Sequence, residues 1–170
     1  MKKGNVEESL RVINIILNKS SESDLNWVVI KNKKILEKEK ELLDEYRKPS
    51  EKFMEYENKR IELCKKYANK DEKGNVLFDD VIDLQGNRNK EFSGLRDNQE
   101  FQEKFKLLID DYKDELEEEN KKLNYYENII KNEEIETPLN KIKTKIPNGI
   151  ISGKDMEFLL EMIDEDVYTD

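Results

Sequence analysis

Two long segments carry apolar residues at the spacing of an amphipathic helix, and this pattern constrains the fold more than any other feature of the sequence. In residues 24–68 the two neighbouring seven-residue series are Val28, Ile35, Leu42, Tyr56 and Leu63, and Val29, Leu36, Leu43 and Cys64. In residues 97–132 they are Ile109, Leu116, Leu123 and Ile130, with Phe105, Tyr112 and Tyr126 beside them. Each segment has one apolar seam that needs a partner. We therefore predict that the two helices bury their seams against each other as an antiparallel hairpin.

The first segment is interrupted once, at Pro49. Proline lacks a backbone N–H, so it either kinks the helix or ends it, and in the second case Ser50 would cap a new helix. The residues between the two segments contain two β-like runs, 75–78 and 81–84, with Asp79–Asp80 between them as a turn. The sequence therefore predicts a small β-hairpin at the tip of the helical hairpin.

Short elements are expected at both ends of the chain. An apolar helix comes first, and Ser23 or Asp24 can cap the long helix that follows it. Near the other end, a strand-like stretch precedes a short helix with Ser152 as its cap. The predicted elements of a single domain over 1–170 are 6–18, 24–68, 69–95, 97–132 and 135–166. The predicted fold class is mainly α: an antiparallel coiled-coil-like helical hairpin with a small β-hairpin at the tip and short terminal helices at the base.

The composition favours an elongated helical body over a sphere. Of the 170 residues, 42% are charged and 35% are apolar, against about 25% and about 45–50% in ordinary globular domains. Disorder is the alternative, but the regular apolar spacing and the six Phe and seven Tyr argue against it. The chain has one cysteine and no histidine, which excludes an intrachain disulfide and fits a cytoplasmic location. No segment approaches ~18 consecutive apolar residues, so no membrane span is expected.

Negative charge is concentrated around the second long segment. Residues 22–70 hold 13 Lys or Arg and 11 Asp or Glu, whereas residues 97–136 hold 6 Lys and 14 Asp or Glu. The densest acidic positions, predicted to bind a partner, are Asp110, Asp111, Asp114, Glu117, Glu118 and Glu119. A solvated helix face explains them, and so does a surface that docks a basic patch of another protein. Direct nucleic-acid binding is disfavoured, because phosphate contacts need concentrated Lys and Arg.

The sequence offers little for catalysis. Residues 69–80 fit an EF-hand loop poorly, because Lys73 stands where Ca²⁺ needs an oxygen ligand and Asp80 replaces the usual bidentate Glu. A turn in which Gly74 adopts positive φ explains the same residues. Cys64 lacks a histidine partner and, like Trp27, is expected in the core. We therefore predict no enzyme activity, no catalytic residues, no cofactor and no metal site.

One stretch, YANKDEKGN at residues 67–75, resembles a motif of small bacteriophage and prophage proteins of unestablished function. In that group a charged helix ends in a Tyr-Ala-x-Lys-Asp-Glu-x-Gly-Asn turn, and a β-hairpin, a second charged helix and an Ile/Leu-rich tail follow. The order is similar here over about residues 8–164, although the loop at 83–97 is longer than in the group. The resemblance implies a phage setting and supplies no site residues.

Three classes of function remain open at this point. The favoured one is a non-enzymatic phage or prophage interaction protein, such as an inhibitor of a host antiviral or nucleic-acid-binding complex, which acts through its acidic helix in the cytoplasm of an infected or lysogenic bacterium. The alternative is a virion assembly chaperone or minor structural accessory with a prefoldin-like clamp. An enzyme is the third. The expected partner is a protein with a basic surface, with no nucleic acid and no membrane involved and a homo-oligomer possible.

Overall fold

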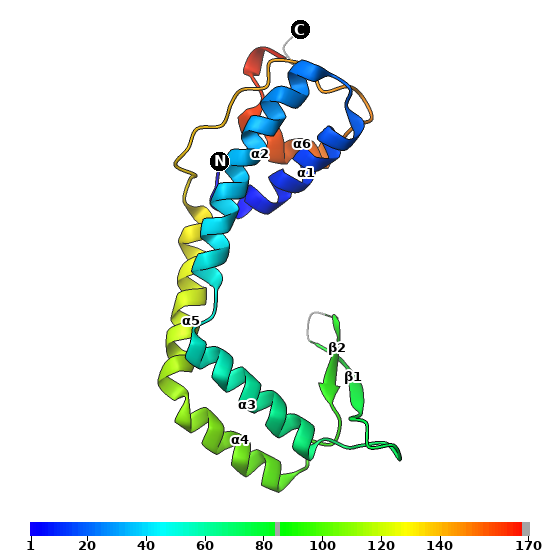
Figure 1. The fold of residues 1–170 in the computed structure, drawn as a ribbon, viewed down its shortest axis with the longest axis vertical. Coiled ribbons are helices and arrows are strands. Elements are labelled where there is room, and N and C mark those ends of the chain that lie inside the picture. The colour runs from blue at the N-terminus through cyan, green and yellow to red at the C-terminus, as the bar shows by residue number, and fades with distance from the viewer. Residues whose placement is uncertain (84–85, 168–170) are drawn as a thin grey trace. The chain divides into compact units, whose positions relative to one another are not determined.

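The structure is a computed structural model that describes residues 1–83 and 86–167, and the chain is mainly helical there (Figure 1). Contacts divide the chain into two compact units, the first made of Met1–Lys48 with Lys122–Asp170 and the second of Pro49–Lys121. That the whole of 1–170 forms one domain stays a prediction. The predicted fold class is confirmed in its coarse features, since the chain has long antiparallel helices, a two-stranded antiparallel hairpin and short C-terminal helices.

The helices and strands have the following bounds. The first unit contains η1 (Lys3–Asn5), α1 (Val6–Lys19), α2 (Ser23–Arg47), η2 (Ile130–Asn132), α6 (Gly153–Met156), η3 (Glu157–Met162) and η4 (Glu165–Val167). The second contains α3 (Glu51–Tyr67), β1 (Phe78–Ile82), β2 (Arg88–Phe92) and α4 (Gln99–Asp111). The chain passes from the second unit back to the first along α5 (Lys113–Asn128).

The core of the first unit forms where α1 packs antiparallel to α2. Ile13 and Ile16 of α1 and Leu36 of α2 are fully buried, and residues near the C-terminus complete the cluster. There Ile142 pairs as an isolated parallel bridge with Ile163, so residues 135–166 do contain a strand-like contact and short helices. Burial of such side chains, worth roughly 1.5–3 kcal/mol each, is what holds these short terminal elements on the long helix.

Of the two neighbouring series predicted to form the seam of α2, only one is fully buried. Leu42 is 67% exposed, whereas the side chains of the neighbouring series, Val29, Leu36 and Leu43, are buried. Trp27 is 61% exposed, so its predicted core position is wrong, and the Lys31 ammonium lies over its ring at 4.9 Å. The apolar surface of α2 is wider than its buried face, and α1 decides which part of it is covered.

A buried asparagine stands on that same face of α2. The Asn32 side chain is fully buried and donates from Nδ2 to the carbonyl oxygen of Asn140 at 2.9 Å. Its Oδ1 accepts from the Asn140 backbone N–H at 2.7 Å. Asn32 therefore provides hydrogen-bond partners for the backbone N–H and carbonyl of Asn140, which lies in a segment without regular secondary structure. These bonds fix that segment on α2.

The interruption of the first long helical segment is a full break. At Pro49, α2 ends with Arg47, and α3 begins at Glu51 behind Ser50, whose hydroxyl accepts a hydrogen bond from the Phe53 backbone N–H at 3.0 Å. The cap predicted for Ser50 is confirmed. The caps predicted for Ser23 or Asp24 are wrong, because α2 begins at Ser23 and its N-cap residue, Glu22, makes no side-chain cap bond.

Contacts along α3 and α4 show that the two helices run antiparallel within the second unit. Tyr67 pairs with Phe101 at 6.1 Å between ring centroids, and Tyr56 pairs with Tyr112 at 5.7 Å. The residue number rises on one helix as it falls on the other. Aromatic pairs of this kind contribute about 0.5–1.5 kcal/mol beyond their buried area, and they take the place of the leucine-rich seam of an ordinary coiled coil.

The predicted β-hairpin exists, but the predicted register of its strands is wrong. Asp79 and Asp80 lie inside β1 rather than in a turn, and β1 pairs with β2 through Phe78 opposite Phe92. The predicted strand over 81–84 ends in Leu84, which lies outside the described residues. The register is set instead by the turn that follows β1.

That turn repeats an earlier one. In residues 71–75 the Asp71 carboxylate accepts from the Asn75 backbone and side-chain N–H groups at 2.8 and 2.9 Å, and Gly74 has φ of +83°. Asp83 and Asn87 make the same pair of bonds, at 2.8 and 2.9 Å, around a Gly86 with φ of +86°. Two turns of the form Asp-x-x-Gly-Asn therefore set the strand register, because only glycine adopts this φ without strain.

Candidate functional site

The carboxylates predicted to bind a partner lie around the junction of α4 and α5. Asp110 and Asp111 end α4, and Tyr112 breaks the helix with φ of −113° before α5 begins. Asp114, Glu117 and Glu118 follow at the three- and four-residue spacing that places side chains on one helix face. The side chains of Asp110, Asp111, Asp114, Glu117 and Glu118 are all exposed, and these five residues are the acidic face.

Most of the acidic face meets at an open hollow of about 490 Å³ within the second unit. The residues that line it are Lys52, Glu55, Asp110, Asp111, Tyr112, Lys113, Asp114, Glu115 and Glu118. Four of the six predicted residues therefore come together, while Glu117 is exposed outside the lining and Glu119 is buried. With more carboxylates than lysines around it, the hollow suits a lysine or arginine side chain of another molecule.

Glu119 does not belong to the displayed surface, which corrects its predicted role. It is only 7% exposed, and Oε1 accepts a hydrogen bond from the Ser50 backbone N–H at 2.9 Å. One turn earlier, Glu115 accepts from the Ser50 hydroxyl. Both carboxylates therefore stabilise the start of α3, where backbone N–H groups lack helical partners and the helix dipole favours negative charge.

The five carboxylates of the acidic face form no ion pair with any side chain in the described ranges 1–83 and 86–167. One nearby lysine of α3 is engaged elsewhere: Lys59 bonds Glu55 at 2.8 Å and the Tyr112 hydroxyl at 2.7 Å. Hydrogen bonds from Lys59 and then Tyr112 lower the pKa of Glu55, and the same contacts raise the pKa of Lys59. This cluster ties α3 to the break between α4 and α5, and it holds the acidic face on a defined backbone.

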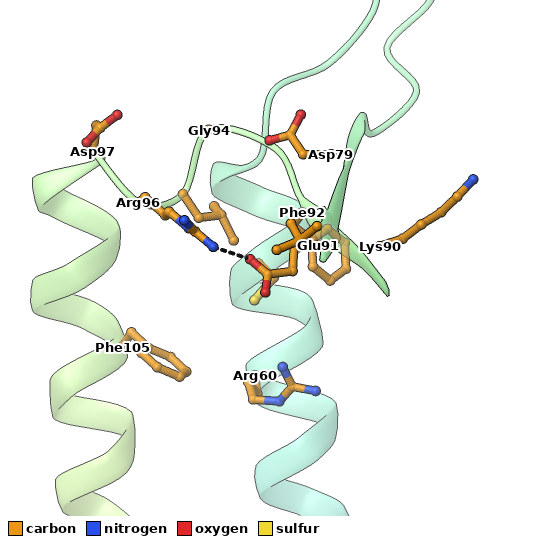
Figure 2. Close-up of a pocket in the computed structure, with 12 residues that line it drawn as sticks. Arg60, Asp79, Lys90, Glu91, Phe92, Gly94, Arg96, Asp97 and Phe105 are labelled. Carbon is orange, nitrogen blue, oxygen red and sulfur yellow. Dashed lines mark hydrogen bonds and ion pairs between the residues drawn. The ribbon is translucent and has the colours of Figure 1, made fainter. Parts of the chain in front are cut away.

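A second hollow, of about 830 Å³, lies between the ends of α3 and α4 and the β-hairpin (Figure 2). Both signs of charge line it, and Arg96 donates to Glu91 at 3.1 Å across it, as the dashed line shows. Arg60 is engaged with Glu57 on its own helix through two bonds of 2.9 and 2.8 Å. Two of the three cations in the lining, Arg60 and Arg96, are thus already paired, so this hollow offers a ligand less charge than its lining suggests.

Cys64 also lines the second hollow and is 5% exposed. Burial raises the pKa of its thiol, which keeps the side chain in the unreactive protonated form. Its predicted role as a small core residue is confirmed by its burial. Nowhere in the described part of the chain do three or more Asp, Glu or Cys side chains gather as a metal ion would require.

Two residues that sequence reasoning left out, Lys52 and Glu55, share the hollow with the acidic face. They belong to α3, more than fifty residues earlier in the chain. The Ser50–Glu119 hydrogen bond brings the first turns of α3 beside the α4–α5 junction, and no local signal in the sequence marks this pairing. Among the described residues, none of the helices combines the length and apolar composition that a bilayer crossing needs.

Comparisons with known proteins add no relative. No protein-family model matches the chain, and neither a curated protein nor a solved structure matches it.

Proposed function

We propose that this chain is a non-enzymatic phage or prophage interaction protein that binds a basic surface of a host protein through its acidic face. The observation that carries the proposal is that the carboxylates around the α4–α5 junction fall into two groups. Glu115 and Glu119 are engaged at the start of α3, whereas the five residues of the acidic face stay exposed without an ion pair in the described residues. Charge that the fold does not use is available to a partner.

The physical consequence is fast and salt-sensitive association. Several like charges held on one rigid surface raise the local concentration of a basic partner and can speed association by 10–1,000-fold. Screening limits this effect to about 8–10 Å at physiological salt. Binding through the acidic face should therefore weaken steeply as salt rises, while binding through an apolar seam would not.

The partner class follows from charge and from the resemblance. A protein surface that normally holds phosphate carries the concentrated Lys and Arg that an acidic face would complement. Among the proteins of an infected or lysogenic bacterium, antiviral and other nucleic-acid-binding complexes present such surfaces. The proposal therefore places the chain in the cytoplasm as an inhibitor that occupies the basic surface of such a complex.

Affinity capture from phage-infected cells, read by mass spectrometry, tests the proposal. The tagged chain is compared with a variant in which the acidic face is neutralised by D110N, D111N, D114N, E117Q and E118Q. A matched control removes the same number of charges elsewhere, through E22Q, D24N, E41Q, E62Q and E72Q. The expected result is a nucleic-acid-binding complex that the natural chain and the control capture and the neutralised variant does not. High salt should release the complex from the natural chain and from the control.

Two outcomes would count against the proposal. Capture that survives neutralisation of the acidic face would show that the face is not the contact. Co-purification with capsid or tail proteins in place of a host complex would support the alternative, a virion assembly chaperone or minor structural accessory.

A further inference from the structure

The β-hairpin of the second unit has a free edge that differs in kind from the acidic face. A sheet of two strands leaves one edge of each strand open, and the chain places no third strand there in its described residues. Isolated two-stranded hairpins are marginally stable in water, and a third strand is the usual remedy. Figure 1 shows β1 and β2 side by side in this part of the chain.

The register identifies which backbone groups are open. The Asp83 N–H donates to the Asn87 carbonyl and the Ser93 N–H to the Leu77 carbonyl, both at 3.0 Å, which makes these two pairs hydrogen-bonded rungs. Hydrogen-bonded and non-bonded rungs alternate in an antiparallel pair. The rungs of Phe78, Asp80 and Ile82 are therefore non-bonded, and their N–H and C=O groups point away from β2.

The side chains of these same three residues share one face of the hairpin, because strand side chains alternate. Phe78 is 52% exposed and pairs with Phe92 at 4.9 Å between ring centroids, while Ile82 is 66% exposed. Asp80 stands between them and is exposed. On this face an incoming strand would therefore meet an apolar, an acidic and an apolar side chain, one at every second position along β1.

The open edge of β2 is built differently. Its outward backbone groups belong to Arg88, Lys90 and Phe92, so two of the three positions carry exposed cations. Lysine and other charges along an edge are a common protection against strand addition. β1 has two apolar side chains and one acid at the equivalent positions, which makes it the more receptive edge.

A second copy of the chain fits this edge poorly. In a closed dimer, β1 would pair with the partner copy's β1 about a two-fold axis, and the central Asp80 would oppose its own equivalent. Like charges directly opposite destabilise a pair. Pairing β1 with the other copy's β2 relieves the repulsion but does not close, so it leads to open-ended assembly.

We infer that the free edge of β1 accepts an extended basic segment of another protein as a third, antiparallel strand. The segment carries apolar residues opposite Phe78 and Ile82 and a lysine or arginine opposite Asp80. A second cation opposite Asp79 is favoured as well, because Asp79 stands across from Glu91 on the other face of the hairpin. Backbone hydrogen bonds supply affinity in this mode of recognition, and the alternate side chains supply specificity. The inference does not rest on the acidic face.

A synthetic peptide with the central sequence Val-Thr-Lys-Lys-Val tests it, with its first Val opposite Ile82 and its last opposite Phe78. Binding to the full chain is measured by fluorescence anisotropy. N-methylation of the first Lys blocks a backbone bond to Asp80 and should weaken binding by at least about tenfold. The N-methyl group of the second Lys would point away from β1, so the affinity should stay within about threefold of that of the unmodified peptide.

Charge is tested separately. The D80N substitution and a peptide with Glu in place of both Lys should each weaken binding, while circular dichroism checks that the variant folds. Equal effects of the two N-methylations would overturn the inference, since they would show a purely ionic contact. The neutralised variant of the acidic face separates the two proposals: retained peptide binding supports the β1 edge, whereas lost binding would move the peptide to the acidic face and overturn the inference alone.

Discussion

The Ser50 backbone N–H donates a hydrogen bond to Oε1 of Glu119 at 2.9 Å, which joins the start of α3 to the most acidic helix of the chain. Because Glu115 accepts from the hydroxyl of the same serine, two carboxylates four residues apart hold one helix terminus. The carboxylates around the α4–α5 junction therefore have two roles. Glu115 and Glu119 hold the start of α3, whereas the residues of the acidic face remain exposed.

Replacing Glu119 by alanine should destabilise the second unit, although it relieves negative charge. The partly buried Ser50 N–H would lose its acceptor, and such a loss costs about 1–3 kcal/mol. The E117A substitution is the matched control on the same helix, and surface changes of that kind stay within about 0.5 kcal/mol. Urea denaturation followed by circular dichroism measures both. Equal free energies of unfolding for the two variants would contradict the role assigned to Glu119.

Asn32 offers a second test, on the core of the first unit. An N32A substitution removes the acceptor of the Asn140 N–H and the donor to its carbonyl, and it leaves a small void on a fully buried face. A loss of about 2–3 kcal/mol is expected in the free energy of unfolding. N14A, an exposed asparagine of α1, should change it by less than about 0.5 kcal/mol. A nearly neutral N32A would mean that residue 140 is not held in this way.

Gly94 should tolerate a side chain less well than Gly74, although both have positive φ, +79° and +83°. A Cβ at Gly94 would lie 2.5 Å from the Asn69 side chain, whereas the same atom at Gly74 meets nothing within 4 Å. Both alanine variants carry the conformational cost of about 1–2 kcal/mol. G94A carries an additional clash, which should speed amide exchange at Asn69, whose N–H donates to the Ser93 carbonyl.

The Asn69 side chain gives that test its control. In an N69A background the clash disappears, so G94A should then cost no more than G74A. If G94A stays the worse of the two without the Asn69 side chain, the close approach is not the cause.

Much of the fold was predictable from the sequence, because long helical periods and breakers such as Pro49 act locally. The choice between the Leu42 series and the Leu43 series was not local. The two series lie side by side on α2, and only the packing of α1 decides which is covered. Asn32 was readable in part, since it stands among the buried positions of α2, but its meaning depends on Asn140, more than a hundred residues away.

The β-hairpin register was predictable and was missed. Asp-Glu-Lys-Gly-Asn at 71–75 and Asp-Leu-Gln-Gly-Asn at 83–87 share three positions, and a glycine of positive φ beside an Asx pair outweighs two consecutive aspartates as a turn signal. The acidic face was half predictable. Exposed acids follow from composition, but the engagement of Glu119 required knowledge of where Ser50 lies.

The contact between Arg11 and Asp155 predicts how stability depends on pH. Arg11 Nη2 donates to Asp155 Oδ1 at 2.5 Å, and the Ser152 hydroxyl donates to Oδ2 at 2.8 Å within the capping box of α6. These bonds, with that from Arg11 the largest cause, lower the pKa of Asp155 to about 2. In the unfolded chain the pKa of an aspartate is about 3.9.

Because the folded-state pKa is the lower one, the unfolded chain takes up the proton first as the pH falls. The stabilisation is therefore complete above about pH 4 and is lost between about pH 4 and pH 2. The difference in free energy of unfolding between the natural chain and D155N should be largest above pH 4 and should shrink toward zero at about pH 2. E72Q, at an exposed loop residue, should show a difference that stays flat over the same range. A D155N difference that is equally flat would mean that Arg11 and Ser152 do not hold the carboxylate in solution.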